Sequence, residues 1–425
     1  MSRHTGATLT SSGFLACMIV LTGLSSYSCR GPEAAARGPI PIGVVAPFFT
    51  TPGEGIRRGA AMAVAEINAG GGVLGRPLRI AEVDDEFSPA KATLAYQSLA
   101  GKDRVAAVVG FAGSGAIFAV MEQLSRYGVP VLGTGVAADR LTEMVRQDPG
   151  RYSRFFRVMH RSSELAQVTT GFLRDFLHRE LGFRRFAILV EDDIWTKYLR
   201  DEWKKTIAAE PGMSLVFEDT FSPQTTDFSA TFRQIAGSGA EYVLDASSRV
   251  PSALYLKRWA ELQGPLIGAV PTGAGTRKYY EELGAAGTGV STVGVIPAAN
   301  NPLSDKAAAW HSGYVKRYGD PEYTSAYSYD AVYILKQAIE RAGGGEPAQL
   351  SAALEKTDWS GVMGRYQFGA DHQPRFGPGY RAINMLQYQE ADPEGYRVIW
   401  PRERAVAPYK PPAWWKGTIG AGRKP

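Results

Sequence analysis

The side chains best suited to catalysis are few in this sequence and lie far apart along it. Both cysteines, Cys17 and Cys29, fall within the first thirty residues, so the rest of the chain has no thiol nucleophile, disulfide framework or thiolate metal cluster. Four histidines follow this segment, none spaced as the close ligand pair of a zinc hydrolase: His160, His178, His311 and His372. We therefore expect neither a metal site nor a cofactor.

Ser114 is the serine best placed to meet a charged ligand. Residues 111–115, FAGSG, follow the apolar run Val105–Val109 and precede a helical pattern that reaches Tyr127. Ala112 replaces the first glycine of the GxSxG nucleophile motif, and no nearby histidine could activate the hydroxyl. At an N-cap position the hydroxyl and the unpaired backbone N–H groups would bind an anion, unless the serine only caps the helix. The sequence leaves these two roles open.

Two further patterns point to structure rather than chemistry. Residues 133–138, GTGVAA, have the GxGxxA form of a dinucleotide-binding turn, but they follow the fourth strand rather than the first and lack the usual acid about twenty residues on. Residues 84–86, DDE, end a strand without a second acidic cluster to complete a metal site. We interpret the first as a glycine-rich turn and the second as a solvated strand end.

These residues are carried by alternating strands and helices. Apolar runs typical of strands begin at Ile40, Leu78, Val105 and Val129, and the segments between them show helical spacing. A second series of the same kind covers residues 164–296. Strands that alternate with helices form parallel sheets covered on both faces, and each series has the length of a domain. We therefore predict two α/β lobes.

Composition and charge agree with a globular, exported body. Of 425 residues, 44% are hydrophobic and 21% charged, which is enough to form large cores. The net charge of +5 comes from the ends, because residues 1–28 and 401–425 hold seven of the 47 basic and one of the 42 acidic residues. A nearly neutral body argues against nucleic-acid binding. The tail 401–425, rich in proline and tryptophan, is expected to cover an apolar groove with Trp414-Trp415, or else to bind a partner.

The N-terminus has the pattern of an export signal. Residues 13–24, GFLACMIVLTGL, are too short to span a bilayer but fit the apolar region of a signal peptide. We expect residues 1–28 to be removed and Cys29 to become the lipidated N-terminus, although Ser26 stands where a lipobox usually has leucine. Cleavage after Ala36 is the alternative. The mature chain would then be periplasmic or on the outer face of the cell membrane.

The segment 68–78, NAGGGVLGRPL, resembles the NAxGGVxGRPL segment of the leucine/isoleucine/valine-binding family, the type I periplasmic solute-binding proteins of ABC transporters. The likeness extends over about residues 39–400, in family order, through these segments: Asp84-Asp85, Val109-Gly110, Gly128–Val131, Asp227–Ser229, Tyr327–Val332 and Gly361–Gly364.

The resemblance implies a type I periplasmic binding protein fold, in which two Rossmann-like lobes with parallel sheets are joined by a three-strand hinge. Lobe 1 would comprise residues 39–158 and 298–357, and lobe 2 residues 159–297 and 358–400. A solute would be caught between the lobes as the hinge closes.

Matching to the family, together with two aromatic residues that could form flat walls, assigns these residues to the ligand: Phe48, Phe49, Gly113, Ser114, Gly135, Val136, Ala137, Trp195, Ser248, Arg249 and Thr272. Ser114 would hold the carboxylate of the solute. Ala137 replaces a family threonine and has no hydroxyl, and Thr272 falls where the family has the acid that neutralises an amino-acid ammonium.

We therefore expect the extracytoplasmic solute-binding component of an ABC importer, working as a monomer with a membrane permease and without catalysis. The neutral Thr272 and the positive Arg249 predict a carboxylate without an α-amino group, aromatic or short and aliphatic. The alternative ligand is a branched-chain amino acid whose ammonium is held by Glu191 or Asp245. The alternative role is a sensory domain that presents its liganded form to a membrane signalling partner. An enzyme is disfavoured because no acid–base constellation is present.

Overall fold

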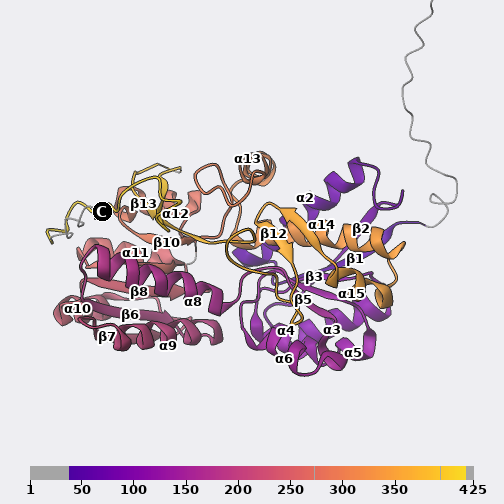
Figure 1. Ribbon diagram of the computed structural model, residues 1–425, viewed down its shortest axis with the longest axis horizontal. Coiled ribbons are helices and arrows are strands. Elements are labelled where there is room, and N and C mark those ends of the chain that lie inside the picture. The colour runs from indigo at the N-terminus through magenta and orange to yellow at the C-terminus, as the bar shows by residue number, and fades with distance from the viewer. Residues whose placement is uncertain (1–37, 272, 393, 418–425) are drawn as a thin grey trace, which may run out of the picture.

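Two lobes lie side by side in the computed structural model, which describes residues 38–271, 273–392 and 394–417 (Figure 1). Each lobe is built around its own sheet, and the α/β fold class with two Rossmann-like lobes is confirmed. The predicted signal peptide and Cys29 lie outside the described residues. None of the helices within the described ranges is both long and apolar enough to cross a membrane.

Lobe 1 contains a five-stranded parallel sheet in the order β2-β1-β3-β4-β5. Its strands are β1 (Ile40–Ala46), β2 (Leu78–Asp84), β3 (Val108–Gly110), β4 (Val131–Gly133) and β5 (Phe155–Arg157). Successive side chains of β1 enter opposite cores: Val44 packs with α2 and α14, and Val45 packs with α3 and α4. Burial on both faces explains why this strand reads as an unbroken apolar run.

The helices of lobe 1 cover both faces of this sheet (Figure 1). They are α2 (Thr51–Ala69), α3 (Pro89–Gly101), α4 (Ser114–Met121), α5 (Leu124–Tyr127), α6 (Arg140–Gln147), α7 (Pro149–Tyr152), α13 (Ala307–Tyr318), α14 (Tyr323–Ala342) and α15 (Pro347–Glu355). Helix α2 ends at Ala69, immediately before the predicted glycine stop, and Gly71 and Gly72 have positive φ angles of 101° and 79°.

Lobe 2 contains a seven-stranded sheet in the order β14-β13-β10-β9-β8-β6-β7. Its strands are β6 (Arg185–Glu191), β7 (Ser214–Phe221), β8 (Tyr242–Ser247), β9 (Leu266–Pro271), β10 (Ser291–Gly294), β13 (Asn384–Tyr388) and β14 (Tyr396–Trp400). The expectation of wholly parallel sheets is wrong here, because β13 pairs antiparallel with both β10 and β14. The short turn between β13 and β14 permits only an antiparallel pair.

The helices of lobe 2 lie on the two faces of this sheet and complete its layers. They are α8 (Ser162–Gly171), the π-helical η1 (Phe172–Glu180), α9 (Ile194–Ala209), α10 (Ser229–Ser238), α11 (Ser252–Glu261), α12 (Arg277–Leu283) and the 3₁₀ turn η2 (Gly284–Gly287). Trp203 of α9 is fully buried and donates its indole N–H to Thr169 of α8 at 2.8 Å, which fixes the two helices against each other.

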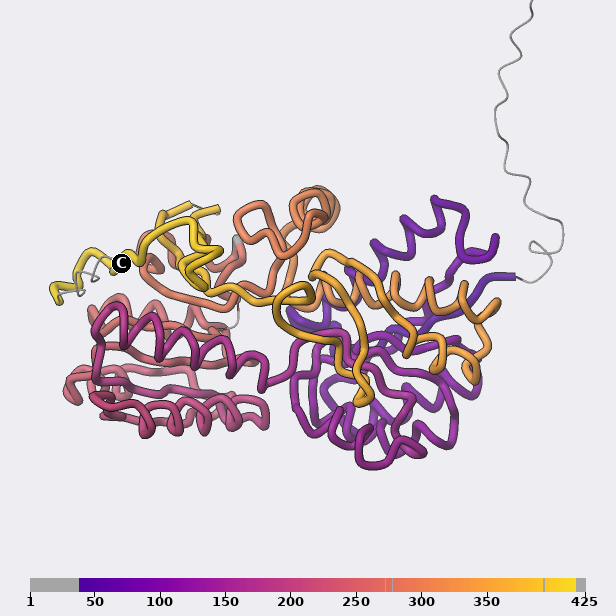
Figure 2. Tube along the Cα trace, viewed as in Figure 1, coloured from indigo at the N-terminus to yellow at the C-terminus, as the bar shows by residue number. Residues whose placement is uncertain are grey.

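Three chain segments pass between the lobes, and the tube in Figure 2 follows them. They are residues 158–161, residues 295–306 and residues 368–383. A hairpin precedes the third, formed by β11 (Asp358–Gly361) and β12 (Gly364–Gln367), and its Val362, Met363 and Tyr366 belong to the lobe 1 core. The predicted boundary at residue 358 therefore lies before this hairpin, whereas the chain returns to the lobe 2 sheet only at β13.

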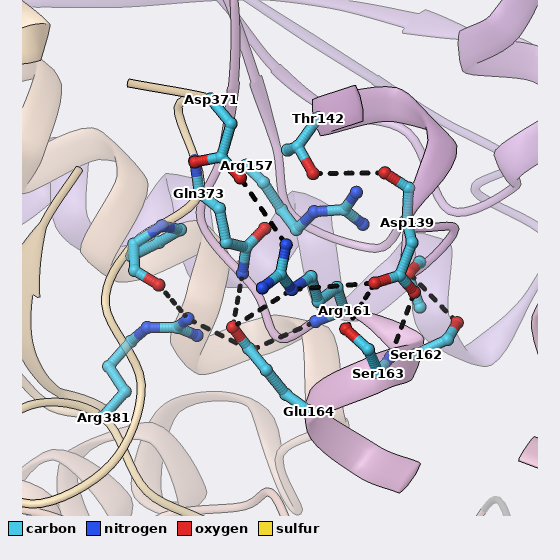
Figure 3. A network of polar contacts seen from close by, with 12 residues as sticks. Asp139, Thr142, Arg157, Arg161, Ser162, Ser163, Glu164, Asp371, Gln373 and Arg381 are labelled. Carbon is cyan, nitrogen blue, oxygen red and sulfur yellow. Dashed lines mark hydrogen bonds and ion pairs between the residues drawn. The ribbon is translucent and has the colours of Figure 1, made fainter. Parts of the chain in front are cut away.

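A buried polar network ties the first and third crossings together (Figure 3). The Glu164 carboxylate accepts from the amide of Gln373 at 3.0 Å and pairs with the Arg381 guanidinium at 3.5 Å, while only 4% and 2% of the two charged residues are exposed. Arg161 lies 3.5 Å from Asp371 and 3.7 Å from Glu164. Burial raises the pKa of Glu164 against the pull of Arg381 and Arg161. The hinge is thus a desolvated ionic cluster rather than an apolar joint.

The C-terminal tail packs on lobe 2, as Figure 1 shows where the chain ends on that side of the molecule. The Trp414 ring lies 4.9 Å from that of Trp259 and donates its N–H to the carbonyl of Gly264 at 3.2 Å. Trp415 meets the ring of Phe183 at 6.1 Å. The tail covers an apolar groove with these two rings, in keeping with the first of the two expectations.

Candidate functional site

The largest cavity lies between the lobes, has a volume of about 520 Å³ and is lined by residues of both. It opens at the carboxyl ends of the parallel strands, where open α/β sheets bind their ligands. Its volume falls within the ordinary range of small-molecule sites. Seven of the eleven predicted ligand residues line it: Gly113, Ser114, Gly135, Ala137, Trp195, Ser248 and Arg249.

The lobe 1 wall is the start of α4. Strand β3 ends at Gly110, whose φ of 138° and close approach to Val45 leave no room for a Cβ, since one would lie 2.1 Å from the Val45 carbonyl oxygen. The chain then turns and α4 begins, with Gly113 as its N-cap and Ser114 as its first helical residue. The predicted N-cap role of Ser114 is therefore wrong. Its hydroxyl makes no hydrogen bond within the described part of the chain, and it faces the cavity beside free helix N–H groups.

The lobe 2 wall comes from the start of α9 and from the loop after β8. Trp195, in the first turn of α9, donates its indole N–H to the Ser248 hydroxyl at 3.3 Å, so the ring is held at the cavity. The loop is organised by Glu191, the last residue of β6, whose buried carboxylate accepts the backbone N–H groups of residues 248, 249 and 250 at 2.9, 2.9 and 3.1 Å.

The charge of Arg249 is already neutralised in this arrangement. Its guanidinium lies 2.8 Å from the Glu191 carboxylate and 3.2 Å from that of Asp193. A cation shared by two carboxylates attracts an additional anion only weakly. The sequence-based argument that Arg249 supplies positive charge to the ligand therefore loses its main support, although the side chain does line the cavity.

The two acids considered for an amino-acid ligand do not line the cavity. Glu191 is fully buried and occupied by the loop that it organises. Asp245 is 1% exposed and accepts from the Tyr255 hydroxyl at 2.8 Å; burial raises its pKa to about 7. Both carboxylates serve the interior of lobe 2.

Four of the predicted ligand residues are not brought to the cavity by the described structure. Phe49 is 72% exposed and packs edge-on against Phe87, and Phe48 lies beneath the guanidinium of Arg57, 5.7 Å from its ring centre. Val136 turns its side chain into the core between α4 and β4 and is fully buried. Thr272 lies outside the described residues, although both of its neighbours, residues 271 and 273, line the cavity.

Sequence reasoning missed several cavity residues that come from turns. Phe87 reaches the cavity from a loop with a positive φ of 56°, and Asp193 is the N-cap of α9. Glu322 and Tyr323 stand at the start of α14. The one available signal was the cap pattern ahead of α14, where a polar residue precedes a long amphipathic helix.

His160 lines the cavity without carrying charge. It is 5% exposed, and its Nδ1 lies 2.9 Å from the hydroxyl of Tyr327. Burial and the nearby charges of Arg381 and Arg157 lower its pKa to about 3, so the ring is neutral at neutral pH. Within the described ranges no group of three or more histidine, cysteine or acidic side chains could hold a metal ion. The site can therefore bind through dipoles, hydroxyls and carboxylates.

Comparison with known proteins agrees with this geometry. The family model described as periplasmic binding protein matches residues 39–389. The chain is 26% identical over 344 residues to the Leu/Ile/Val-binding protein homolog 3 of Brucella melitensis, covering 79% of this chain and 88% of that one.

Two solved structures share the fold. One is the branched-chain amino acid transporter substrate binding protein LivJ of Streptococcus pneumoniae, in complex with isoleucine, with a TM-score of 0.73, 21% identity and coverage of 85% of this chain and 100% of that one. The other is an ABC transporter solute binding protein of R. palustris in complex with benzoate, with a TM-score of 0.71, 19% identity and coverage of 88% and 98%. Since the family model covers most of its length, this chain belongs to the periplasmic binding protein family.

Proposed function

We propose that this protein is the solute-binding component of an ABC importer and captures a small carboxylate-containing solute in the interlobe cavity by hinge closure. The single observation that supports this most directly is the Ser114 hydroxyl, which lacks a protein partner in the described structure and stands with the N-terminus of α4 at the cavity wall. Hydroxyl and helix N–H groups at a helix start favour a carboxylate. The protein binds and releases its solute unchanged.

Both candidate ligand classes carry the carboxylate that this wall would hold. A structural relative was solved with isoleucine and another with benzoate. Apolar side chains such as Trp195 and Phe87 line the cavity and would pack against either carbon skeleton. The importer role also implies a membrane permease as partner and a monomeric binding protein that delivers the solute to it.

Isothermal titration calorimetry on the mature chain tests this function. The ligands are amino acids and the same carbon skeletons without the amino group, for example isoleucine with 3-methylpentanoate and phenylalanine with 3-phenylpropanoate, together with benzoate. We expect at least one carboxylate to bind with unit stoichiometry and to raise the unfolding temperature, because a ligand that binds only the folded state stabilises it. Binding of none of these carboxylates, or turnover of any of them, would contradict the proposal.

Cys29 would anchor the mature protein to the membrane. This assignment comes from the sequence alone and lies outside the described residues. Diacylation of the cysteine would hold the protein stably, because two chains bind a bilayer where one binds only marginally. Mass spectrometry of the mature protein from its native host should show a lipidated N-terminus at Cys29; an unmodified chain that starts at Arg37 would support cleavage after Ala36 instead.

A further inference from the structure

The cavity wall carries more negative than positive charge. Three acids line it, Asp192, Asp193 and Glu322, against two cations, Lys197 and Arg249. Lys197 pairs with Asp192 at 3.2 Å, and Arg249 is shared between Asp193 and the buried Glu191 behind the wall. The cations are therefore already satisfied by protein carboxylates.

Glu322 is the acid without a cation. Over the described residues no lysine or arginine forms an ion pair with it. Its position is fixed by close packing, since a Cβ on Gly55 of α2 would lie 2.8 Å from the Glu322 Cβ, and its backbone N–H donates to the Ser325 hydroxyl at 3.0 Å. A half-buried carboxylate held at a ligand cavity with no counter-ion is costly to ionise unless the ligand provides a positive charge.

Asp193 approaches the same part of the cavity from lobe 2. The phenol of Tyr323, which follows Glu322 in the chain, lies within the electrostatic reach of both acids: burial raises its pKa most, and the negative charges of Glu322 and Asp193 raise it further. Asp193 shares one guanidinium with Glu191, so two carboxylates face one cation. One acid from each lobe is thus placed around the Tyr323 hydroxyl.

We infer that Glu322 of lobe 1, with Asp193 of lobe 2, binds a protonated nitrogen of the solute, so that the solute carries a cationic group as well as its carboxylate. This inference rests on the proposed function and narrows its ligand class. It replaces Thr272, the position that the family resemblance assigns to the ammonium, with an acid from another lobe. A cation between the two acids would also attract the lobes toward each other and favour the closed form.

The ionisation of Glu322 gives this site a characteristic pH dependence. Burial raises the pKa of Glu322 to about 7; Asp320 adds to the increase, while Lys278 and Arg58 oppose it. Asp193, Tyr323 and the neutral His160 are the other titratable groups around this part of the cavity. A protonated nitrogen binds the ionised carboxylate, so affinity for it should fall as the pH drops through 7, whereas affinity for a simple carboxylate should not.

The test uses calorimetry of matched ligand pairs on wild type, Glu322→Gln and the control Glu346→Gln. Glu346 is also a helix N-cap, at α15, but it lies outside the cavity lining. We expect the amino member of a pair, such as isoleucine, to bind more tightly than 3-methylpentanoate. Glu322→Gln should weaken the amino member about 10- to 100-fold and leave the deaminated member nearly unchanged. Glu346→Gln should bind both as wild type does, and thermal unfolding checks that each variant is folded.

The pH series adds a second measurement. Between pH 8 and pH 6 the affinity of wild type for the amino member should fall, and that of Glu322→Gln should stay level. Tighter binding of the deaminated acids, or an unchanged affinity of Glu322→Gln for the amino member, would overturn the inference while the proposed function stands. Failure of every carboxylate to bind would overturn both.

Discussion

Among single residues, Ser114 separates the contributions of binding and folding most cleanly. Its hydroxyl caps no helix, whereas the hydroxyl of Ser88 at the start of α3 accepts the N–H of Lys91 at 3.4 Å. We expect Ser114→Ala to weaken binding of the solute by about 1–3 kcal/mol, because a hydrogen bond to a charged oxygen is lost, and to leave stability within about 0.5 kcal/mol.

The matched control is Ser88→Ala, which should cost about 1 kcal/mol of stability through its lost cap and leave affinity unchanged. Calorimetry and urea unfolding on both variants give the comparison. An unchanged affinity in a folded Ser114→Ala protein would remove this serine from the site.

Asp330 of α14 predicts a pH effect on stability. It is fully buried and accepts the N–H groups of Val362 and Met363 at 2.9 and 3.0 Å. Burial nevertheless raises its pKa to about 7 from the ordinary 3.8. Because the unfolded chain ionises first, the folded state binds the extra proton and its stability falls as the pH rises through this window. From pH 5 to pH 8 the loss from this group should be on the order of 2 kcal/mol.

Urea unfolding of wild type and Asp330→Asn at the two pH values measures this effect. Asparagine cannot ionise, so the stability of the variant relative to wild type should improve between pH 5 and pH 8. A constant difference between the two proteins would mean that Asp330 titrates in the folded state as it does in the unfolded chain.

The sequence could locate the residues of the cavity that lie directly after strands, because parallel strands end at one edge. Ser114 and Arg249 were found in this way. It could not show that Arg249 would be neutralised by Glu191 and Asp193, since this depends on a loop wrapped around a buried carboxylate. Glu322 was missed because it reaches the cavity from α14, a helix distant in sequence from every other part of the wall.

At the scale of elements, the strand–helix alternation was predictable because each strand is short, apolar and buried on both faces. The edge strands β13 and β14 and the hairpin β11–β12 were not, because their pairing depends on contacts between distant parts of the chain. The predicted helix from Ile117 to Tyr127 is divided at Glu122-Gln123 into α4 and α5. Local spacing shows that an element exists more reliably than where it ends.

The crossing segments offer a test of the ionic hinge. Arg381→Met leaves the buried Glu164 without its guanidinium, and removal of one partner of a buried pair costs about 3–5 kcal/mol. Glu164→Gln combined with Arg381→Met should recover much of this loss, because the uncompensated charge disappears while the Gln373 amide keeps an acceptor. A double-mutant cycle from urea unfolding measures the coupling. Additive effects of the two substitutions would show that the pair does not act as a unit.

At the scale of the whole molecule, the two lobes each supply part of the cavity wall, and only three segments connect them. Ser114 and Glu322 lie on lobe 1, and Trp195 and Asp193 lie on lobe 2. A solute that contacts both walls gains most when they approach, so the binding free energy should favour the closed arrangement. The hinge, with its buried ion pair, would keep the lobes in register during this movement.

This movement can be measured with spin labels at the rim of the cavity. The chain has only two cysteines, Cys17 and Cys29, so a protein that begins at Gly38 accepts labels at chosen sites. Phe49 and Tyr198 are 72% and 39% exposed and flank the cavity from lobe 1 and lobe 2. In Phe49→Cys/Tyr198→Cys, the distance between the labels should shorten when a solute that binds by calorimetry is added to saturation, since the rims approach as water leaves the cavity.

The control pair is Phe49→Cys/Gln349→Cys, whose second label sits on exposed α15, so that both labels lie in lobe 1. Its distance should stay constant, because each lobe moves as a body with its own core. Shortening across the cavity but not within lobe 1 identifies hinge closure, and shortening in both pairs would point to a change within lobe 1 instead. Unchanged distances in both pairs with solute bound would mean that the cavity binds its ligand without closing.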